Sequence, residues 1–331
     1  MTGRIAVLGS GSWGTALAIQ FARAGRETVM WGIETHEIAA MAKKRRNQTY
    51  LPNAPFPDNL AVTTELDEAL HGAEDLLAVV PSHAFREMLE RLAQAATPVK
   101  RLAWATKGFE TDTGLLPHQV AEQVLGKDIP TAVLSGPTFA AEVGVGLPSA
   151  MVIASADPSF ALHLAESITT DNFRAYTSTD ITGVEVGGAT KNVLAIGAGI
   201  SDGLGFGANT RIALVTRGLM EMTRLGVALG AQKDTFMGLS GMGDLVLTCT
   251  DDQSRNRRFG LALGKGGNIE QARLAIGQVV EGYYAAIAVH RVARRLELEM
   301  PIVEEIYKVV YEGASPQEAV VALMRRPITP E

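Results

Sequence analysis

The sequence is poor in the residues that build disulfides and metal centres. It has one cysteine, Cys249, and six histidines in 331 residues. A single cysteine cannot form an intramolecular disulfide or a cysteine-rich zinc site, and low cysteine usage is typical of reducing compartments. No two histidines have the H-x-x-x-H spacing that presents two zinc ligands on one helix face. We therefore expect no bound metal, and we expect Cys249 to be a small buried hydrophobic residue.

Long apolar runs and a strong excess of one charge are also missing. The longest mostly apolar segment, residues 184–200, contains Glu185 and Lys191, so no transmembrane helix is expected there. Glycines and serines interrupt the N-terminal apolar run after four residues, which argues against a signal region. The net charge of −6 and the pI of about 5.6 argue against broad attraction to nucleic acid or to an anionic membrane. We expect a cytoplasmic protein that binds any anionic ligand through local groups.

Glycine, in contrast, is abundant, with 34 residues, and three glycines share one stretch with the spacing G-x-G-x-x-G. Four apolar residues, 5–8, precede Gly9, Gly11 and Gly14, and a helix-forming segment follows. In a dinucleotide-binding turn the first glycine permits the turn and the second lets a pyrophosphate approach the backbone. The third lets helix and strand pack closely. Glu34 lies 20 positions after Gly14, where an acidic residue meets a ribose hydroxyl.

Short apolar segments alternate with amphipathic ones through the first half of the chain. We expect eight strands, at residues 5–8, 28–31, 60–62, 76–79, 102–105, 132–134, 150–154 and 173–176. Helical patterns lie between several of them, as at residues 15–23 and 85–92. Such alternation is typical of an α/β fold with a doubly wound, Rossmann-type sheet, whose ligands bind beyond the carboxyl ends of the strands.

Strand signals stop after Tyr176, and the remaining sequence has helical patterns. They cover residues 180–202, 211–229, 256–263, 285–296 and 301–311, with a glycine-rich connection before the third. We therefore expect a dinucleotide-binding domain over residues 1–187. An all-helical C-terminal domain, which binds substrate and carries the catalytic group, is expected over residues 188–331.

Lysine is the remaining candidate for the proton donor of a nicotinamide-dependent reduction. A Tyr-x-x-x-Lys pair and a set of cysteine zinc ligands are both missing. Lys191 interrupts an apolar, small-residue helical segment, where an unpaired buried ammonium would be costly. It would need a carboxylate, a ligand or a cleft, and partial desolvation would lower its pKa toward the range of an acid/base catalyst. On this argument alone, a lysine that extends its ammonium to solvent from the helix edge is equally compatible.

Eight short motifs occur in order between about residue 5 and residue 282. They are Gly9–Leu17, Lys107–Glu110, Ser135–Glu142, Gly188–Asn192, Gly238–Leu245, Thr248–Thr250, Ser254–Asn256 and Val280–Gly282. This set resembles the bacterial NAD(P)-dependent glycerol-3-phosphate dehydrogenases and is far more specific than any single motif. The resemblance implies reversible reduction of dihydroxyacetone phosphate to sn-glycerol 3-phosphate with NAD(P)H, supplying glycerol phosphate for phospholipid synthesis. It also implies that Lys191 is the general acid/base.

The resemblance further assigns roles to the other site residues. Substrate binding is implied for Lys107, Gly136, Thr138, Lys191, Asp244, Ser254, Arg255 and Asn256, with Asn192 and Thr248 beside the site. Cofactor binding is implied for Gly9, Gly11, Ser12, Trp13, Gly14, Ile33, Lys107, Ala140, Arg255, Val279 and Glu281.

Three of these residues have a clear physical role within the implied site. Lys107, at the end of a predicted strand, would lower the pKa of Lys191 as a second ammonium. Asp244, in a glycine-rich turn, is the natural carboxylate partner of Lys191. Arg255 offers a planar fork of donors to a phosphate. Arg257 and Arg258, which follow it, are compatible with a solvated surface.

One position departs from the family. The family often has arginine or histidine at the position of Ile33, where a cation could meet the 2′-phosphate of NADP. Ile33 followed by Glu34 removes that charge and adds a carboxylate. We expect NADH to be used at least as well as NADPH, unless the basic cluster Lys43–Arg46 folds over the adenosine.

Two other functions stay open. One is another lysine-dependent dehydrogenase of the same architecture that acts on a hydroxy acid, and the other is a non-catalytic dinucleotide-binding regulator. The segment Ser254–Asn256 favours a small phosphorylated substrate, and the presence of Lys107, Lys191, Asp244 and Arg255 together argues against a regulator. A homodimer is implied by the resemblance, and no nucleic-acid partner or membrane span is expected.

Overall fold

The computed structural model describes residues 3–325, and the chain divides into two compact units. The first unit contains the residues up to Thr106 together with Pro117–Ile181, and the second contains Lys107–Leu116 together with the residues from Thr182 onward. The predicted boundary at 187/188 falls inside helix α8 (Ile181–Gly203), whereas the C-terminal segment of the second unit begins at Thr182. The segment Lys107–Leu116, which we call the strap, belongs to the second unit although it was expected in the first domain.

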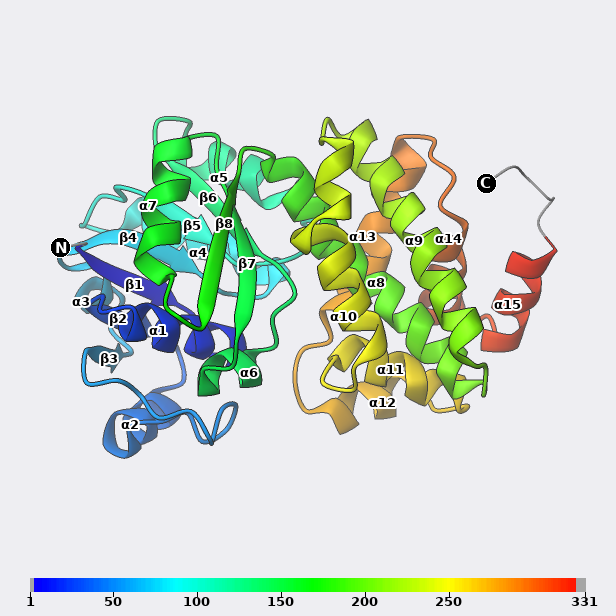
Figure 1. Cartoon of the computed structure of the whole chain (residues 1–331), viewed down its shortest axis with the longest axis horizontal. Coiled ribbons are helices and arrows are strands. Elements are labelled where there is room, and N and C mark those ends of the chain that lie inside the picture. Colours follow the sequence, from blue (N-terminus) through cyan, green and yellow to red (C-terminus); the bar gives the residue numbers. More distant parts are fainter. Residues whose placement is uncertain (1–2, 326–331) are drawn as a thin grey trace. The chain divides into compact units, whose positions relative to one another are not determined.

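One eight-stranded sheet forms the centre of the first unit, and all eight predicted strands are present (Figure 1). They are β1 (Arg4–Leu8), β2 (Thr28–Trp31), β3 (Leu60–Thr63), β4 (Ala73–Ala78), β5 (Leu102–Trp104), β6 (Thr131–Ser135), β7 (Ser149–Ala154) and β8 (Phe173–Ser178). Their order across the sheet is β3-β2-β1-β4-β5-β6-β7-β8. Neighbouring strands are parallel except β6 and β7, which are antiparallel. The chain reverses direction across the sheet at β1, which makes this the doubly wound fold that was predicted.

Helices connect the strands of this sheet. They are α1 (Ser12–Arg23), α2 (Thr35–Lys44), α3 (Leu66–Leu70), the 3₁₀ turn η1 (Ser82–Ala84), α4 (Phe85–Gln94), α5 (Pro117–Leu125), α6 (Ala140–Val145) and α7 (Pro158–Ile168). Helix α1 is buried from Gly14 to Ala22 because it packs against both β1 and α6. Helix α7 starts at Pro158, where the side chain of Asp157 accepts the N–H groups of Ser159 and Phe160, and it packs on β8 (Figure 1).

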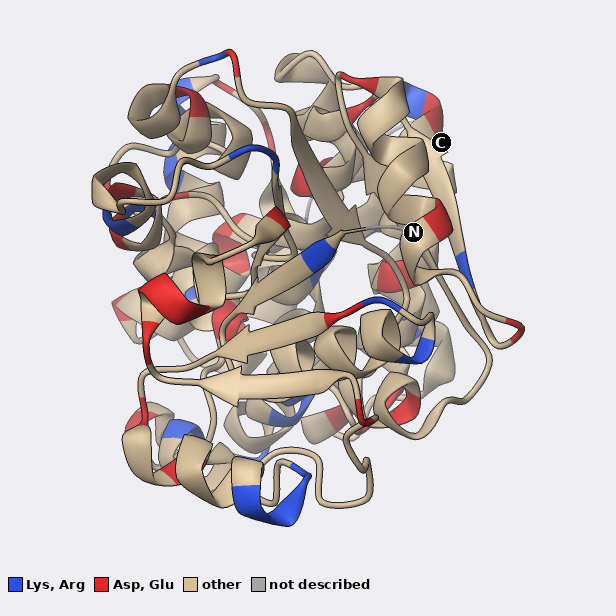
Figure 2. Cartoon of the chain, turned by 90° about the vertical axis from the view of Figure 1, so that its left-hand side faces the viewer, with Lys and Arg blue, Asp and Glu red and all other residues tan. Residues whose placement is uncertain are grey.

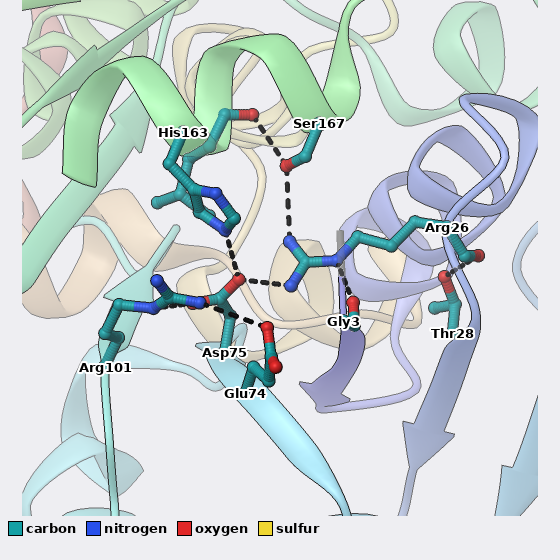
Figure 3. A network of polar contacts seen from close by, with 9 residues as sticks. Gly3, Arg26, Thr28, Glu74, Asp75, Arg101, His163 and Ser167 are labelled. Carbon is teal, nitrogen blue, oxygen red and sulfur yellow. Dashed lines mark hydrogen bonds and ion pairs between the residues drawn. The ribbon is translucent and has the colours of Figure 1, made fainter. Parts of the chain in front are cut away.

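A buried ionic network lies at the amino-terminal ends of the central strands. Asp75 of β4 accepts hydrogen bonds from Arg26, before β2, and from Arg101, before β5 (Figure 3). His163 of α7 shares a hydrogen bond of 2.8 Å with the same carboxylate. Burial would raise the pKa of Asp75, but Arg26 and its other partners outweigh burial and hold that pKa below its usual value. The glycine-rich turn follows the carboxyl end of β1, so this network lies at the opposite edge of the sheet from that turn.

The second unit is helical in the described residues that follow the strap, as predicted. Its elements are α8 (Ile181–Gly203), α9 (Ala208–Ala228), η2 (Lys233–Met237), the π-helical η3 (Leu239–Gly243), α10 (Asp244–Thr250), α11 (Arg255–Gly264), α12 (Ile269–Ile276), α13 (Glu281–Arg295), α14 (Pro301–Tyr307), the π-helical η4 (Lys308–Glu312) and α15 (Pro316–Met324). Helix α8 is buried from Gly183 to Ser201 and forms the centre of the unit. Between residues 3 and 325, no helix has the length and apolar content that a membrane span requires.

Helices α8 and α11 touch through glycines. A Cβ atom at Gly199 of α8 would lie 2.0 Å from a main-chain oxygen of α11, and one at Gly260 of α11 would lie 2.0 Å from a main-chain oxygen of α8. Only glycine permits this approach, because real Cβ atoms do not come closer than about 3 Å. The contact therefore fixes how Arg255, the first residue of α11, lies relative to α8.

Candidate active site

The glycine-rich turn after β1 has the geometry of a dinucleotide-binding turn. Gly9 has a φ of +127°, and a Cβ there would lie 2.4 Å from the carbonyl oxygen of Val79. A Cβ at Gly14 would lie 2.0 Å from the carbonyl oxygen of Gly9. A Cβ at Gly11, in contrast, would meet nothing within 4 Å. The first and third glycines are thus required by the turn itself, and the second faces open space at the start of α1.

The first turn of α1 has donors available for an anion. Gly11 is the N-cap, and no side chain caps the helix. The backbone N–H groups that begin with Ser12 therefore lack intrahelical partners. The indole Nε1 of Trp13 is buried without a hydrogen-bond partner in the part of the chain that the structure describes. These residues fit the pyrophosphate of a dinucleotide.

The end of β2 carries an exposed apolar residue and a carboxylate. Ile33 is 67% exposed, and Glu34 is the N-cap of α2. The basic cluster Lys43–Arg46 lies at the other end of α2, ten residues and about 15 Å away, at the bottom of the view in Figure 2. Arg45 is also engaged there, since its guanidinium donates to the carbonyl oxygens of Pro57 and Leu60 at 2.5 and 2.8 Å. The structure therefore separates the basic cluster from Glu34 by the length of the helix.

A second turn follows β6 at the same edge of the sheet. Gly136 has a φ of +147°, and a Cβ there would lie 2.9 Å from the Cα atom of Met151 in β7. The Thr138 hydroxyl donates to the carbonyl oxygen of Gly136 at 3.3 Å, and α6 begins at Ala140. Because β1, β2 and β6 run in the same direction, the predicted contact residues of the first unit all follow carboxyl ends of strands at one edge.

The second unit contains a buried ionic centre of two lysines and one aspartate. The Nζ atom of Lys191 lies 2.5 Å from Oδ1 of Asp244, and Nζ of Lys107 lies 2.8 Å from Oδ2. Lys191 also donates to the hydroxyl of Thr248 at 3.2 Å. Lys191 is 7% exposed and Asp244 is 1% exposed, so the alternative of a solvent-extended lysine is wrong.

The charges of this centre shift the pKa values of its members. The pKa of Lys191 is lowered to about 7: burial is the main cause, Lys107 adds to the lowering, and Asp244 opposes it. Burial would raise the pKa of Asp244, but Lys107 and Lys191 outweigh burial and hold that pKa below its usual value. Near neutral pH, Lys191 therefore exchanges between ammonium and amine while Asp244 stays ionised. This is the behaviour that proton transfer to and from a substrate requires.

The local structure around Asp244 differs from the predicted glycine-rich turn. Asp244 is the first residue of α10, directly after the π-helical stretch Leu239–Gly243. On α8, Gly187 lies one turn before Lys191, and a Cβ there would lie 2.5 Å from the carbonyl oxygen of Ser240. The glycine lets the π-helical stretch approach α8 and brings Asp244 to Lys191.

The start of α11 presents the predicted phosphate-binding residues. The hydroxyl of Ser254 caps the helix by accepting the N–H of Arg257 at 3.2 Å. Arg255, the first residue of α11, is half-buried, and its Nη1 donates to the side chain of Gln278 at 3.3 Å. Val279, which follows Gln278, is 38% exposed. Sequence reasoning missed Gln278, for which the sequence offers no signal.

Asn256 links the start of α11 to two other helices. Its Nδ2 donates to Oδ1 of Asn192 at 2.9 Å, and its Oδ1 accepts the N–H of Gly282 at 2.9 Å. Asn192 follows Lys191 on α8, and Gly282 follows Glu281 on α13. The structure thus joins α8, α11 and α13 at the residues that follow Lys191, Arg255 and Glu281 in the chain.

Arg257 is buried rather than solvated. It is 8% exposed, and its guanidinium contacts the carboxylates of Asp202, at 2.5 Å, and Asp252. Asp202 also accepts two hydrogen bonds of 2.9 Å from Arg211, so this cluster joins α8, α9 and α11. The sequence does carry a signal, because a carboxylate in the last turn of an apolar helix opposes the helix dipole unless a cation pairs with it. Arg258 is exposed, as expected.

Metal-ligating side chains do not gather anywhere in the described residues. No group of three or more His, Cys, Asp or Glu side chains among residues 3–325 is arranged to hold a metal ion. Cys249 is fully buried, as predicted.

Comparison with known proteins identifies the family. The N-terminal model of the NAD-dependent glycerol-3-phosphate dehydrogenases matches residues 4–161, and the C-terminal model matches residues 180–321. The chain is 53% identical over 328 residues to glycerol-3-phosphate dehydrogenase [NAD(P)+] of Tolumonas auensis, covering 97% of each sequence. It is 54% identical over 328 residues to the enzyme of the same name from Aeromonas hydrophila, again covering 97% of each.

A solved structure gives the same result. The crystal structure of glycerol-3-phosphate dehydrogenase from Coxiella burnetii superposes with a TM-score of 0.94 at 46% identity and covers 98% of this chain and 99% of that one. A ketopantoate reductase from Ralstonia eutropha, 16% identical with a TM-score of 0.60, shares the fold alone. The chain belongs to the family of NAD-dependent glycerol-3-phosphate dehydrogenases.

Proposed function

We propose that this chain catalyses the reversible reduction of dihydroxyacetone phosphate to sn-glycerol 3-phosphate with NAD(P)H. The observation that carries the proposal is the buried centre of Lys191, Asp244 and Lys107, in which the pKa of Lys191 is about 7. Family membership supports the same reaction. The glycine-rich turn, with Ser12 and Trp13, would hold the cofactor's pyrophosphate.

The chemistry divides between cofactor and protein. The reduced nicotinamide supplies the hydride that adds to the C2 carbonyl carbon. The Lys191 ammonium polarises the carbonyl oxygen and then donates its proton to the developing alkoxide, so one hydride and one proton are added. Asp244 stays ionised throughout and orients both ammonium groups. In oxidation the neutral amine of Lys191 takes the hydroxyl proton back.

The substrate class follows from the start of α11. Arg255 presents a forked guanidinium beside the N-terminus of a capped helix, an arrangement suited to a phosphate. Lys107 and Asp244 would contact the substrate's oxygen atoms, and Gly136 and Thr138 are proposed as further substrate contacts. Cofactor contacts are proposed for Ala140, Val279 and Glu281.

Steady-state assays with Lys191→Ala test the proposal. We expect the wild-type protein to oxidise NADH with dihydroxyacetone phosphate and to be at least 100-fold less efficient with ketopantoate or with dihydroxyacetone lacking the phosphate. Lys191→Ala should lose about 10³-fold in turnover, within the range for a positioned acid, while NADH binding stays nearly intact. Preferred reduction of an unphosphorylated keto acid would favour the hydroxy-acid alternative, and cofactor binding without turnover of any substrate would favour a regulator.

We also propose that NADH is used at least as well as NADPH. The carboxylate of Glu34 and the apolar Ile33 offer no cation to a 2′-phosphate, and the basic cluster lies at the far end of α2. Kinetics with both reduced cofactors test this, and a preference for NADPH of 100-fold or more would contradict it.

The cellular setting is proposed from the family and the composition. The product would supply glycerol phosphate for phospholipid synthesis in the cytoplasm, and one fully buried cysteine is compatible with that compartment. A homodimer without a nucleic-acid partner is proposed from family membership and from the net charge of −6. Light scattering of the purified protein, with and without DNA, tests both statements.

A further inference from the structure

The strap has an unusual place in the chain. It lies between β5 and α5, which both belong to the first unit, yet its residues from Lys107 to Leu116 belong to the second. Its first residue, Lys107, is one of the two lysines at Asp244. A lysine side chain is long and flexible, so the position of its ammonium depends on how firmly its main chain is fixed. Something must therefore hold this segment to the unit that contains Asp244 and Lys191.

Two apolar side chains anchor the strap in the core of the second unit. Phe109 is 1% exposed and Leu116 is 2% exposed, and both belong to the core cluster formed with α8, α11 and α13. Between Lys107 and Phe109, Gly108 has a φ of +138°, a conformation that other residues rarely adopt. The main chain can therefore turn sharply between the buried ring and the lysine at the carboxylate.

The rest of the strap is held by helix α13. Arg295 donates from Nη1 to the carbonyl oxygen of Thr113 at 2.9 Å, and Arg291 donates to that of Thr111 at 3.2 Å. Gly114 packs directly on α13, since a Cβ there would lie 2.9 Å from the side chain of Val292. These contacts are independent of the ion pair at Lys107.

We propose that Phe109 and Arg295 are positioning residues that hold the Lys107 ammonium at Asp244. The proposal rests on the proposed function, in which Lys107 acts on the substrate and on Lys191. Phe109 fixes the main chain two residues from Lys107, and Arg295 fixes the far part of the strap against α13. The hydrogen bonds of Arg295 go to the main chain of the strap and Phe109 packs in the apolar core, so both would act on Lys107 through the strap.

A double-mutant cycle with Lys107→Ala tests the proposal on the full chain. We expect Phe109→Ala to lower kcat/KM for dihydroxyacetone phosphate by about 10- to 100-fold, since small misplacements of a catalytic group cost up to about 10²-fold. Arg295→Ala should lower it by about 2- to 10-fold, the equivalent of one hydrogen bond. In the Lys107→Ala background each substitution should change kcat/KM by less than about 2-fold, because no ammonium remains to be positioned. Equal losses in both backgrounds would overturn the proposal.

A second readout separates positioning from stability. Lys107 lowers the pKa of Lys191, so displacing it should move the break in the pH profile of kcat/KM upward, in the direction seen with Lys107→Ala. Two matched controls should leave the break in place: Arg294→Ala, an exposed neighbour of Arg295 on α13, and Val303→Ala, a core truncation in α14. Phe109→Leu supplies the same test if Phe109→Ala does not fold.

The outcomes also separate the two proposals. If Lys191→Ala keeps full turnover, the proposed function fails. If Lys107→Ala is impaired while Phe109→Ala and Arg295→Ala behave like the controls, the proposed function stands and the positioning role is refuted.

Discussion

Replacing the carboxylate of Asp244 is the sharpest test of how the ionic centre sets the pKa of Lys191. Asp244→Asn keeps the size of the side chain and removes the charge that lies 2.5 Å from the Nζ of Lys191 and 2.8 Å from that of Lys107. Asp244 is the group that raises the pKa of Lys191 against burial and Lys107. Its removal must therefore lower that pKa below its present value of about 7.

The magnitude follows from the geometry. A pair of unit charges about 4 Å apart is worth about 4 kcal/mol at an effective dielectric constant of about 20, and about 1.4 kcal/mol corresponds to one pKa unit. We expect the pKa of Lys191 to fall by about 1 to 3 units. With a fall of about 2 units, the ammonium fraction at pH 7 would drop from about one half to about 1%, a loss of about 50-fold in reduction.

The assay is the pH dependence of kcat/KM for dihydroxyacetone phosphate, with unfolding followed in parallel. Removing one partner of a buried ion pair costs about 3–5 kcal/mol, so Asp244→Asn should also be less stable. Asp75→Asn is the matched control, because Asp75 is equally buried in an ionic network of the first unit. It should lose similar stability and keep the wild-type pH profile. If the pH profile of kcat/KM in Asp244→Asn changed slope at the same pH as in the wild type, Asp244 would not be the group that raises the pKa of Lys191.

Three further predictions concern packing, reactivity and cofactor choice. Gly260→Ala places a Cβ 2.0 Å from a main-chain oxygen and should destabilise the protein by about 3 kcal/mol or more in chemical unfolding, whereas Gly207→Ala, which meets nothing within 4 Å, should cost less than about 1 kcal/mol. Burial raises the pKa of Cys249 to about 12, so the thiol should stay protonated at pH 8 and react with a disulfide reagent only as the protein unfolds; rapid modification of the folded protein would contradict its buried position. Ile33→Arg, combined with Glu34→Ala, should improve kcat/KM for NADPH relative to NADH by about 10-fold or more, and an unchanged ratio would remove these positions from the adenosine site.

Much of the first unit could be predicted because its strands have strong local signals. Each strand is a short apolar segment bounded by polar or glycine-containing turns, and the glycine spacing after β1 specifies a turn with few alternatives. The direction of β7 could not be predicted, because an apolar segment does not show whether the strand pairs with its neighbour in a parallel or an antiparallel direction.

The second unit was predicted less completely because short helices depend on tertiary contacts. Helix α10 has seven residues and follows three glycines within six positions, so its sequence resembles a turn. The place of the strap in the second unit could not be predicted for the same reason. Phe109 and Leu116 lie in a loop whose hydrogen-bond partners on α13 are about 180 residues away in sequence. Lys191 could be singled out because a charge within an apolar helix requires a partner. The partner of Lys191, Asp244, could be named only from the resemblance to the family, because the spacing of the two residues in the sequence does not indicate that they pair.

The pH dependence of both directions of the reaction tests the central claim most directly. If Lys191 is the acid/base, kcat/KM for reduction should be level below about pH 7 and fall about tenfold per pH unit above pH 7. That for oxidation should rise tenfold per unit up to the same point and then level off. The overall equilibrium constant fixes how the ratio of the two kcat/KM values changes with pH. The pH at which both profiles change slope is therefore the quantity that reports the pKa of Lys191. A break near pH 7 in both directions that disappears in Lys191→Ala is the predicted result, and a break that persists in this variant would contradict the account.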